Sequence, residues 1–294
     1  MMRKIYLVDD DEDDRIMIRQ ALESVAEEIE IVELTNGKQL LFFLEENPSM
    51  EPSLILMDMN MPIMNGVEAL SALKNRTNLR HIPVVFISTS ENPNFVEQGY
   101  QLGANAYIVK PNTLDGYQRI AHAITLCFLN SYLPATRKGP LRKSKGKNVV
   151  VIEDNPDYAA LMGILIKRDA PGLHVIHQSS AESAINFFES LDKTASAAID
   201  LIIVDLYLPA RKQGLDVLAW LRMSFMDKGI PIAPIVVLSS SGHHQDIQAS
   251  YRLQANAYIV KPADPAGSFS FLTDLCSVWW ETMSFPNKPA SGIV

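Results

Sequence analysis

The chain has 294 residues, a length at which we expect about two domains, each large enough to bury its own core. Its formal net charge of −8 argues against a general nucleic-acid binder, because such proteins present a basic surface to phosphate. No apolar run reaches the ~18 residues that a spanning helix needs. The two cysteines, Cys127 and Cys276, show neither a disulfide framework nor a metal-ligand spacing. We therefore expect a cytoplasmic protein with no membrane or nucleic-acid partner.

Short apolar runs alternate with amphipathic helical patterns along the first part of the chain, residues 1–130. We expect strands at residues 4–8, 30–34, 53–57, 83–87 and 105–109, with five helices between and after them. Asn92 and Pro93 predict the start of the fourth helix, as N-cap and first helical residue, and Gly103 predicts its end. Near-continuous apolar strands of this kind indicate a parallel sheet that is covered by helices on both faces.

A basic stretch, residues 131–147, separates this part from a second one, residues 148–285. The stretch is most simply a flexible linker, and docking onto an acidic partner domain is the alternative. In the second part we expect strands at residues 148–152, 173–177, 201–204, 234–238 and 256–260. One amphipathic helix, roughly residues 265–283, then precedes a short tail, residues 286–294.

The two parts are copies of one domain. The octapeptide Ala-Asn-Ala-Tyr-Ile-Val-Lys-Pro occurs at residues 104–111 and again at residues 255–262. The two copies lie 151 positions apart, and a period this long indicates duplication of a whole domain rather than a solenoid. We expect two doubly wound α/β domains, in which a ligand site lies outside the carboxyl ends of the strands.

Chemically useful side chains follow four of the expected strands in the first copy. Asp9 and Asp10 follow the first strand, Asp58 the third, Ser88 the fourth and Lys110 the fifth. The carboxyl ends of parallel strands meet at one edge, so these groups should lie together. Clustered carboxylates repel one another unless a cation intervenes, and oxygen-only ligation suits Mg²⁺. A carboxylate can also act as a nucleophile and form an aspartyl phosphate.

These residues resemble the receiver domain of bacterial two-component response regulators, over nearly all of both copies. The resemblance implies a chemotaxis-type, flavodoxin-like (βα)5 fold, with a five-stranded parallel sheet in the order 2-1-3-4-5. It implies a phosphoacceptor at Asp58 and a Mg²⁺ (or Mn²⁺) site made by Asp9, Asp10, Asp58 and the backbone carbonyl of Asn60. It further implies a hydroxyl at Ser88, a switch aromatic at Tyr107, a catalytic lysine at Lys110 and a cis peptide before Pro111.

The second copy fits the same pattern, with two departures. Its loop after the acceptor is one residue longer than in the first copy, and Tyr207 stands where the first copy has Asn60. Neither departure removes a chemical group, since the metal would use a backbone carbonyl. The implied metal ligands are Glu153, Asp154, Asp205 and the backbone carbonyl of Tyr207, and the implied acceptor, hydroxyl, aromatic and lysine are Asp205, Ser239, Tyr258 and Lys261.

Some acids near the site have a simpler explanation. Residues 11–14 are all acidic and open the first expected helix, where acids suit the positive end of the helix dipole. We therefore assign them no catalytic role. The strand tyrosines could be plain packing residues, so the switch role of Tyr107 and Tyr258 rests on the resemblance.

The resemblance implies a function in signal transduction. A histidine kinase or a histidine phosphotransfer protein would donate the phosphoryl group, and the helix 4–strand 5–helix 5 face would contact a downstream protein target or a second copy in a dimer. The sequence contains no recognisable output domain, so we expect signalling by protein contact. We expect no enzymatic activity beyond the protein's own phosphoryl transfer and autodephosphorylation.

Two alternatives stay open, and two further ones conflict with residues of this chain. The chain could be a receiver-like scaffold that is never phosphorylated, or the first copy could be active and the second silent. A phosphohydrolase of the haloacid-dehalogenase type would need a second carboxylate two residues after the nucleophile, where this chain has Asn60 or Tyr207. A flavin carrier would need a phosphate-binding loop after the first strand, where this chain has acids that repel phosphate.

Overall fold

The computed structural model describes residues 2–26, 28–130, 146–170, 172–230, 233–262 and 268–286. The contacts of the chain divide it into two compact units. The first contains Met1–Leu133 together with Glu281–Pro286, and the second contains Pro134–Trp280. Residues 281–285, which the sequence assigned to the second domain, therefore belong to the first unit. The expected basic linker lies outside the described residues except for Gly146 and Lys147.

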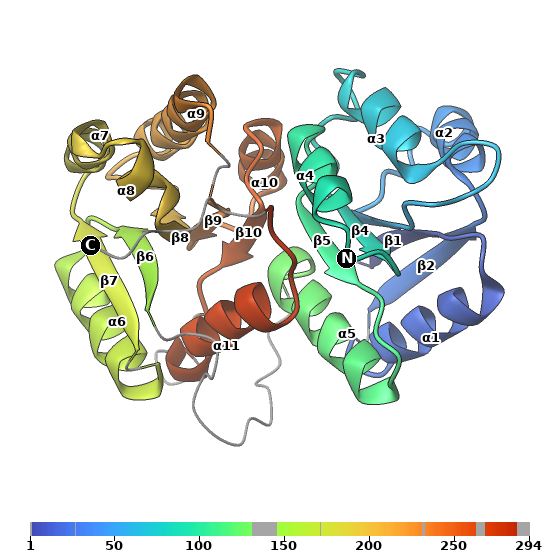
Figure 1. The fold of residues 1–294 in the computed structure, drawn as a ribbon, viewed down its shortest axis with the longest axis horizontal. Helices are drawn as coiled ribbons and strands as arrows, with labels where there is room; N and C mark the ends of the chain where they lie inside the picture. Colours follow the sequence, from blue (N-terminus) through green and yellow to red (C-terminus); the bar gives the residue numbers. More distant parts are fainter. Residues whose placement is uncertain are drawn as a thin grey trace. The chain divides into compact units, whose positions relative to one another are not determined.

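The first unit is a five-stranded parallel sheet in the order β2-β1-β3-β4-β5. Helices α1 and α5 cover one face of the sheet, and α2, α3 and α4 cover the other (Figure 1). Each strand lies within one residue of its expected bounds at either end, which confirms the predicted doubly wound fold. The elements are β1 (Arg3–Val8), α1 (Glu12–Glu23), β2 (Ile29–Leu34), α2 (Gly37–Glu46), β3 (Leu54–Met57), α3 (Gly66–Lys74), β4 (Val84–Ser88), α4 (Pro93–Gln101), β5 (Ala106–Val109) and α5 (Leu114–Phe128).

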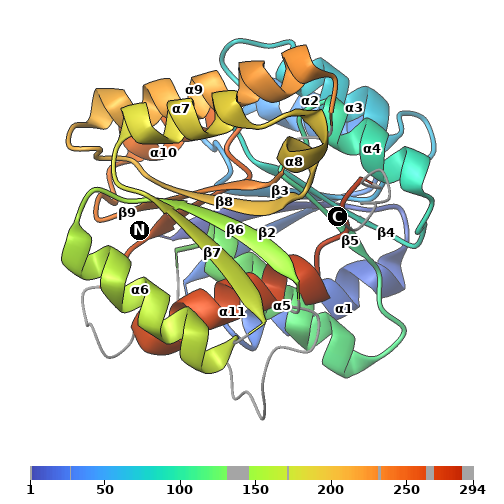
Figure 2. The same cartoon turned by 60° about the vertical axis from the view of Figure 1, so that its left-hand side comes forward.

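The second unit has the same strand order, β7-β6-β8-β9-β10, between α6 and α11 on one face and α7, α9 and α10 on the other (Figure 2). It also contains a short helix, α8, that the sequence did not predict. The Asp192 side chain caps this helix by accepting a hydrogen bond from the Ala195 N–H. The elements are β6 (Lys147–Ile152), α6 (Pro156–Asp169), β7 (Leu173–Gln178), α7 (Ala181–Ser190), α8 (Lys193–Ala197), β8 (Ile199–Asp205), α9 (Arg211–Lys228), β9 (Ile235–Ser239), α10 (His244–Arg252), β10 (Ala257–Val260) and α11 (Ser268–Glu281).

The central strands are apolar because helices bury both of their faces. Every residue of β3 and β4 is buried, which is why these strands read as continuous apolar runs rather than as an alternating pattern. Their carboxyl ends therefore emerge from a rigid core at one edge of the sheet. None of the described helices is both long and apolar enough to cross a membrane.

Local signals fix the ends of α4 as predicted. The Asn92 side chain accepts a hydrogen bond from the Asn94 N–H, and Pro93 is the first helical residue. Gly103, just beyond the helix, has a φ of +92°, which glycine adopts without steric cost. The start and the end of α4 are thus set by residues in its own sequence.

Glycines also allow the loops after the two expected acceptors to turn closely against the sheet. A Cβ atom at Gly66 would lie 2.3 Å from the carbonyl oxygen of Asp58, and one at Gly214 would lie 2.1 Å from that of Leu206. Because no side chain fits at either position, α3 and α9 can begin directly beside the strand ends. Both glycines are thus required by close backbone approach.

Candidate functional site

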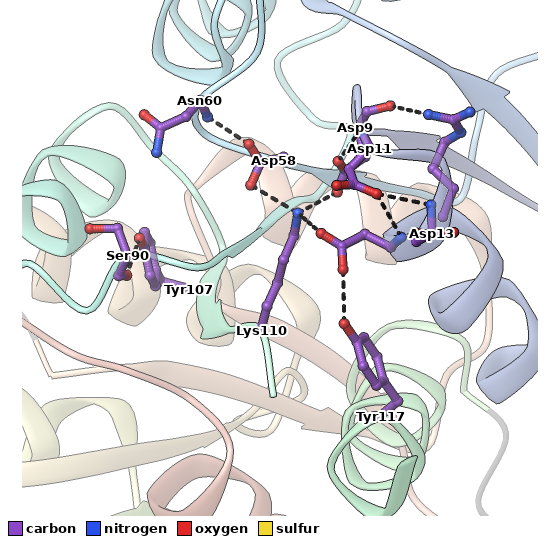
Figure 3. Close-up of polar contacts among 11 residues, drawn as sticks. Asp9, Asp11, Asp13, Asp58, Asn60, Ser90, Tyr107, Lys110 and Tyr117 are labelled. Carbon is purple, nitrogen blue, oxygen red and sulfur yellow. Dashed lines mark hydrogen bonds and ion pairs between the residues drawn. The ribbon is translucent and has the colours of Figure 1, made fainter. Parts of the chain in front are cut away.

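Lys110 lies at the centre of the strand-end cluster in the first unit (Figure 3). Its Nζ atom is 2.7 Å from Asp9 Oδ2, 2.7 Å from Asp14 Oδ2 and 3.3 Å from Asp58 Oδ1. The lysine follows β5, Asp9 follows β1 and Asp58 follows β3, so the parallel sheet brings together side chains from distant parts of the sequence. Asp9, Asp58 and Lys110 thus meet where the strand pattern placed them.

Burial and charge set the protonation of this cluster. Burial raises the pKa of Asp9 to about 6, against the opposing effect of Lys110, and the charge of Asp58 adds to the rise. Burial alone would lower the pKa of Lys110, but its hydrogen bonds to Asp14 and Asp9 and the charge of Asp58 outweigh it and raise that pKa. The ammonium group therefore stays charged between carboxylates that it only partly neutralises.

Asp14 belongs to the site, although its place among the acids that open α1 predicted no role beyond the helix dipole. Besides its contact with Lys110, its Oδ1 atom accepts a hydrogen bond of 3.0 Å from the Tyr117 hydroxyl on α5. One signal could have found it, because Asp14 lies four residues before Ile18, a buried residue on the sheet-facing side of α1. The neighbouring acids behave as expected, since the Asp11 side chain caps α1 and Asp10 is exposed.

The two residues expected to act as the switch in the first unit, Ser88 and Tyr107, are buried. The Tyr107 ring is fully buried, and its hydroxyl donates a hydrogen bond of 2.7 Å to the backbone carbonyl of Ser90. The hydroxyl of Ser88 is also fully buried and has no hydrogen-bond partner among the described residues. Ser88 lies near enough to the Tyr107 hydroxyl to act on its pKa, but a buried hydroxyl without a hydrogen bond of good geometry is costly, and a group bound beside Ser88 could supply one.

The loop after Asp58 orients the carboxylate of this expected acceptor. The Asn60 N–H donates a hydrogen bond of 2.7 Å to Asp58 Oδ2, while Oδ1 faces Lys110. The carboxylate is thus held from two sides.

One correction concerns the peptide before Pro111, which the resemblance implied to be cis. The one cis peptide bond in the described ranges is Leu208–Pro209, and a prolyl bond can take either form.

The second unit assembles the same groups. Lys261 Nζ is 2.7 Å from Glu153 Oε2 and 2.7 Å from Asp205 Oδ2. The Tyr258 hydroxyl donates to the Ser241 carbonyl at 2.9 Å, the counterpart of the bond in the first unit. Ser239 differs from its counterpart, because its hydroxyl oxygen accepts a hydrogen bond of 3.2 Å from the Ser241 N–H.

The lysine of the second unit has a different third neighbour. Tyr158 occupies the place of Asp14, and Lys261 Nζ lies 4.4 Å from the centroid of its ring, at a distance typical of a cation–π contact. Burial raises the pKa of Glu153, and the hydrogen bond and charge of Lys261 oppose this rise. This site thus has one carboxylate fewer around its lysine.

The longer loop of the second unit makes a network of its own around Asp246, a buried residue of α10. The Tyr207 hydroxyl donates to Asp246 Oδ2 at 3.1 Å, and the side chains of Arg211 and Ser241 also donate to this carboxylate. Burial would raise the pKa of Asp246, but these hydrogen bonds outweigh it and lower that pKa. The network joins the loops that follow the expected acceptor and the expected switch hydroxyl.

The carboxylates fit an oxygen-ligated divalent cation. In the second unit one oxygen each of Glu153, Asp154 and Asp205 lie within 4.8 Å of one another. In the first unit, Asp9 and Asp58 converge on Lys110 and share its single positive charge with Asp14. Such a surplus of carboxylate oxygen suits Mg²⁺ or Mn²⁺. Asp10, the other expected ligand of the first unit, is exposed at the rim.

Comparison with known families agrees with this geometry. A family model described as the response regulator receiver domain matches residues 5–122 and again residues 149–268, together more than half of the chain. The chain belongs to the response regulator receiver family. The two matches fall on the two units, and a receiver domain is thus present twice.

Rcp1, DivK and RcpA each match less than half of this chain. The response regulator Rcp1 of Synechocystis sp. is 32% identical over 136 residues, which cover 45% of this chain and 92% of the relative. The polar-differentiation response regulator DivK of Brucella anthropi is 33% identical over 111 residues, or 38% of this chain and 86% of the relative. Among solved structures, the phosphorylated cyanobacterial phytochrome response regulator RcpA is 32% identical, with a TM-score of 0.42 over 46% of this chain and 100% of that one.

Proposed function

We propose that this response regulator accepts phosphoryl groups on Asp58 of the first receiver domain and on Asp205 of the second. The donor would be a histidine kinase or a histidine phosphotransfer protein. The observation that carries the proposal is the shared arrangement of lysine and acceptor. Lys110 reaches Asp58 at 3.3 Å and Lys261 reaches Asp205 at 2.7 Å, each at the end of a buried strand.

The side chains support in-line phosphoryl transfer from a phosphohistidine. A carboxylate oxygen of Asp58 attacks phosphorus, the phosphorus–nitrogen bond breaks, and the imidazole leaves with the bonding electron pair and takes up a proton. Lys110 is placed to stabilise the negative equatorial oxygens, as Lys261 is in the second domain. A bound Mg²⁺ or Mn²⁺ would supply further positive charge, held by Asp9, Asp10 and Asp58 in the first domain and by Glu153, Asp154 and Asp205 in the second.

The buried hydroxyl and tyrosine would convert phosphorylation into a change of surface. The unpartnered Ser88 hydroxyl can donate to a phosphoryl oxygen on Asp58 and draw the β4–α4 loop with it. The Tyr107 hydroxyl donates a hydrogen bond of 2.7 Å to the Ser90 carbonyl of that loop. Movement of the loop would therefore also move the Tyr107 side chain on β5. A ligand shifts such an equilibrium only through a difference in affinity between the two states, and the phosphoryl–Ser88 contact would supply that difference.

The output would then be a contact with a downstream protein through the α4–β5–α5 face. Catalysis would be limited to the protein's own phosphoryl transfer and autodephosphorylation. A scaffold without phosphorylation is less well supported, since neither domain lacks its acceptor or its lysine. A phosphohydrolase is disfavoured because the residue two positions after each acceptor is Asn60 or Tyr207, which offers no carboxylate. The acidic residues that follow β1 likewise disfavour a flavin carrier, because they would repel the phosphate group of the flavin.

The test is the mobility of the protein in a phosphate-affinity gel after incubation with Mg²⁺ and acetyl phosphate. Wild type is compared with Asp58→Asn, Asp205→Asn and the double variant. We expect two shifted bands for wild type, one for each single variant and none for the double variant. A shift that vanishes with Asp58→Asn alone would make the second domain silent. The absence of any shift, together with absent Mg²⁺ binding, would overturn the proposal and leave the scaffold.

A further inference from the structure

Strand β5 is the edge strand of the first sheet, and a short extended segment pairs with it. The segment, residues 282–285, belongs to the first unit. Met283 forms an antiparallel bridge with Ile108, and the Ser284 N–H donates a hydrogen bond of 2.8 Å to the Tyr107 carbonyl. Figure 1 draws the segment in dark red beside α4 and β5.

Side chains of the segment anchor it to α4 as well as to β5. The Tyr100 hydroxyl on α4 donates a hydrogen bond of 3.0 Å to the Ser284 carbonyl. The Tyr100 and Phe285 rings stack with their centroids 6.0 Å apart and an angle of 23° between their planes. The Met283 side chain is buried, with 6% of its surface exposed. The N–H and C=O groups of Ser284 are therefore both hydrogen-bonded. The residues on either side of it, Met283 and Phe285, make the apolar contacts.

We propose that the α4–β5 edge of the first receiver domain is a docking surface for an extended peptide, and that residues 282–285 are its intramolecular ligand. An edge strand presents unpaired N–H and C=O groups that a further strand can satisfy, and side-chain contacts on either side then select the sequence. The selected pattern is a buried apolar residue, a residue that contributes only backbone, and an aromatic residue that stacks on Tyr100.

The surface coincides with the face expected to contact a downstream protein, so a partner that uses β5 must displace the segment. Tethering gives the segment an effective concentration of the millimolar order, which a competing peptide has to exceed. The inference needs only the fold of the first domain and does not require phosphorylation of Asp58. The two proposals can therefore fail independently.

The test uses the full chain and a fluorescein-labelled peptide with the sequence of residues 281–286. Ser284→Pro removes the N–H that bonds to Tyr107, and Ser284→Ala is the matched control that keeps it. Without a phosphoryl donor, we expect the peptide to bind Ser284→Pro at least about tenfold more tightly than wild type or Ser284→Ala, because the tethered competitor has been released. In wild type, the Ser284 amide should also exchange its hydrogen at least about tenfold more slowly than in a short free peptide.

Three outcomes would overturn the inference. The first is equal binding of the peptide to Ser284→Pro and Ser284→Ala. The second is absence of binding to both together with an unprotected Ser284 amide. The third is a dimeric wild type that Ser284→Pro makes monomeric, which would assign the segment to the surface of a second copy. Phosphate-affinity gels of the same variants show separately whether Asp58 accepts a phosphoryl group.

Discussion

Asp14 and Lys110 form a contact of 2.7 Å in the first receiver domain, whereas in the second domain Lys261 lies 4.4 Å from the ring centroid of Tyr158. Asp14 and Tyr158 occupy corresponding positions on α1 and α6, so the two lysines are held by the same helix turn in different ways. In the first domain the lysine is shared among three carboxylates. In the second it has two carboxylates and an aromatic ring.

The first prediction concerns the stability that Asp14 provides. Asp14→Ala removes hydrogen bonds to Lys110 and Tyr117 and should lower the free energy of unfolding of the first domain by about 1–2 kcal/mol. Asp13→Ala is the matched control, because Asp13 lies in the same helix turn but is exposed. Its loss should stay within about 0.5 kcal/mol. Urea denaturation at pH 7 measures both, and equal losses would contradict the assigned role of Asp14.

A second prediction follows from the pKa of Asp9, which burial raises to about 6 from an ordinary value of 3.8. The folded state then holds this proton more tightly than the unfolded state. The stabilisation is fully present below pH 3.8 and is lost as the pH rises through about 6. Between pH 4 and pH 7, wild type without metal should therefore lose about 2 kcal/mol relative to Asp9→Asn, which cannot titrate.

Chemical denaturation of both proteins across this pH range, with a chelator present, measures the difference. Added Mg²⁺ should stabilise wild type at pH 7 more than at pH 5, because a metal binds the deprotonated carboxylate. Parallel pH profiles for wild type and Asp9→Asn would show that Asp9 ionises normally in the fold.

The third prediction concerns Gly66, where a Cβ atom would lie 2.3 Å from a backbone oxygen and 2.8 Å from the Phe86 ring. Gly66→Ala should destabilise the first domain by about 1–3 kcal/mol, because the backbone after Asp58 must move to make room. Gly163→Ala on α6 is the control. Its Cβ would meet nothing within 4 Å, so this substitution should instead stabilise by about 0.5–1 kcal/mol.

Thermal unfolding of the two glycine variants decides this prediction. Because Gly66 follows the expected acceptor, its alanine variant should also accept a phosphoryl group more slowly at Asp58 while Asp205 is unaffected. A neutral effect of Gly66→Ala on stability would show that the loop yields easily.

The fourth prediction concerns Asp246, whose carboxylate accepts hydrogen bonds from Tyr207, Arg211 and Ser241. Asp246→Ala leaves these donors without their partner and should cost about 2–4 kcal/mol. Asp216→Ala is the comparison, since Asp216 pairs with Lys212 on an exposed helix surface and should cost at most about 1 kcal/mol. Urea denaturation, followed through the unfolding transition of the second domain, measures the free energy of unfolding of both variants. Similar losses in the two variants would rule out a structural role for the network.

Much of the fold and part of the site could be predicted from the sequence. The apolar runs gave strand positions because strands buried on both faces leave no polar residues in the run. Asp9, Asp58 and Lys110 could then be grouped, because parallel strands end at one edge of the sheet. This reasoning needs only the order of the elements, and the repeated octapeptide extended it to the second domain.

Contacts between distant segments depend on the tertiary structure. Asp14 is the last of six consecutive acids, residues 9–14, and only the packing of α1 beside β5 and α5 decides that Asp14, as well as Asp9, reaches Lys110. The short helix α8 and the hydrogen bonds to Asp246 likewise depend on how loops pack against neighbouring helices and strands.

The sequence by itself therefore determined the α/β class, the duplication and the strand-end groups, because periodicity and strand order are local properties of the chain. The tertiary structure alone decided that Asp14 holds Lys110 and that residues 282–285 pair with the edge of β5. Both contacts join segments far apart in the sequence. The spacing of Asp14 and Ile18 places Asp14 on the inner side of α1, but no local pattern encodes which residue either segment meets in space.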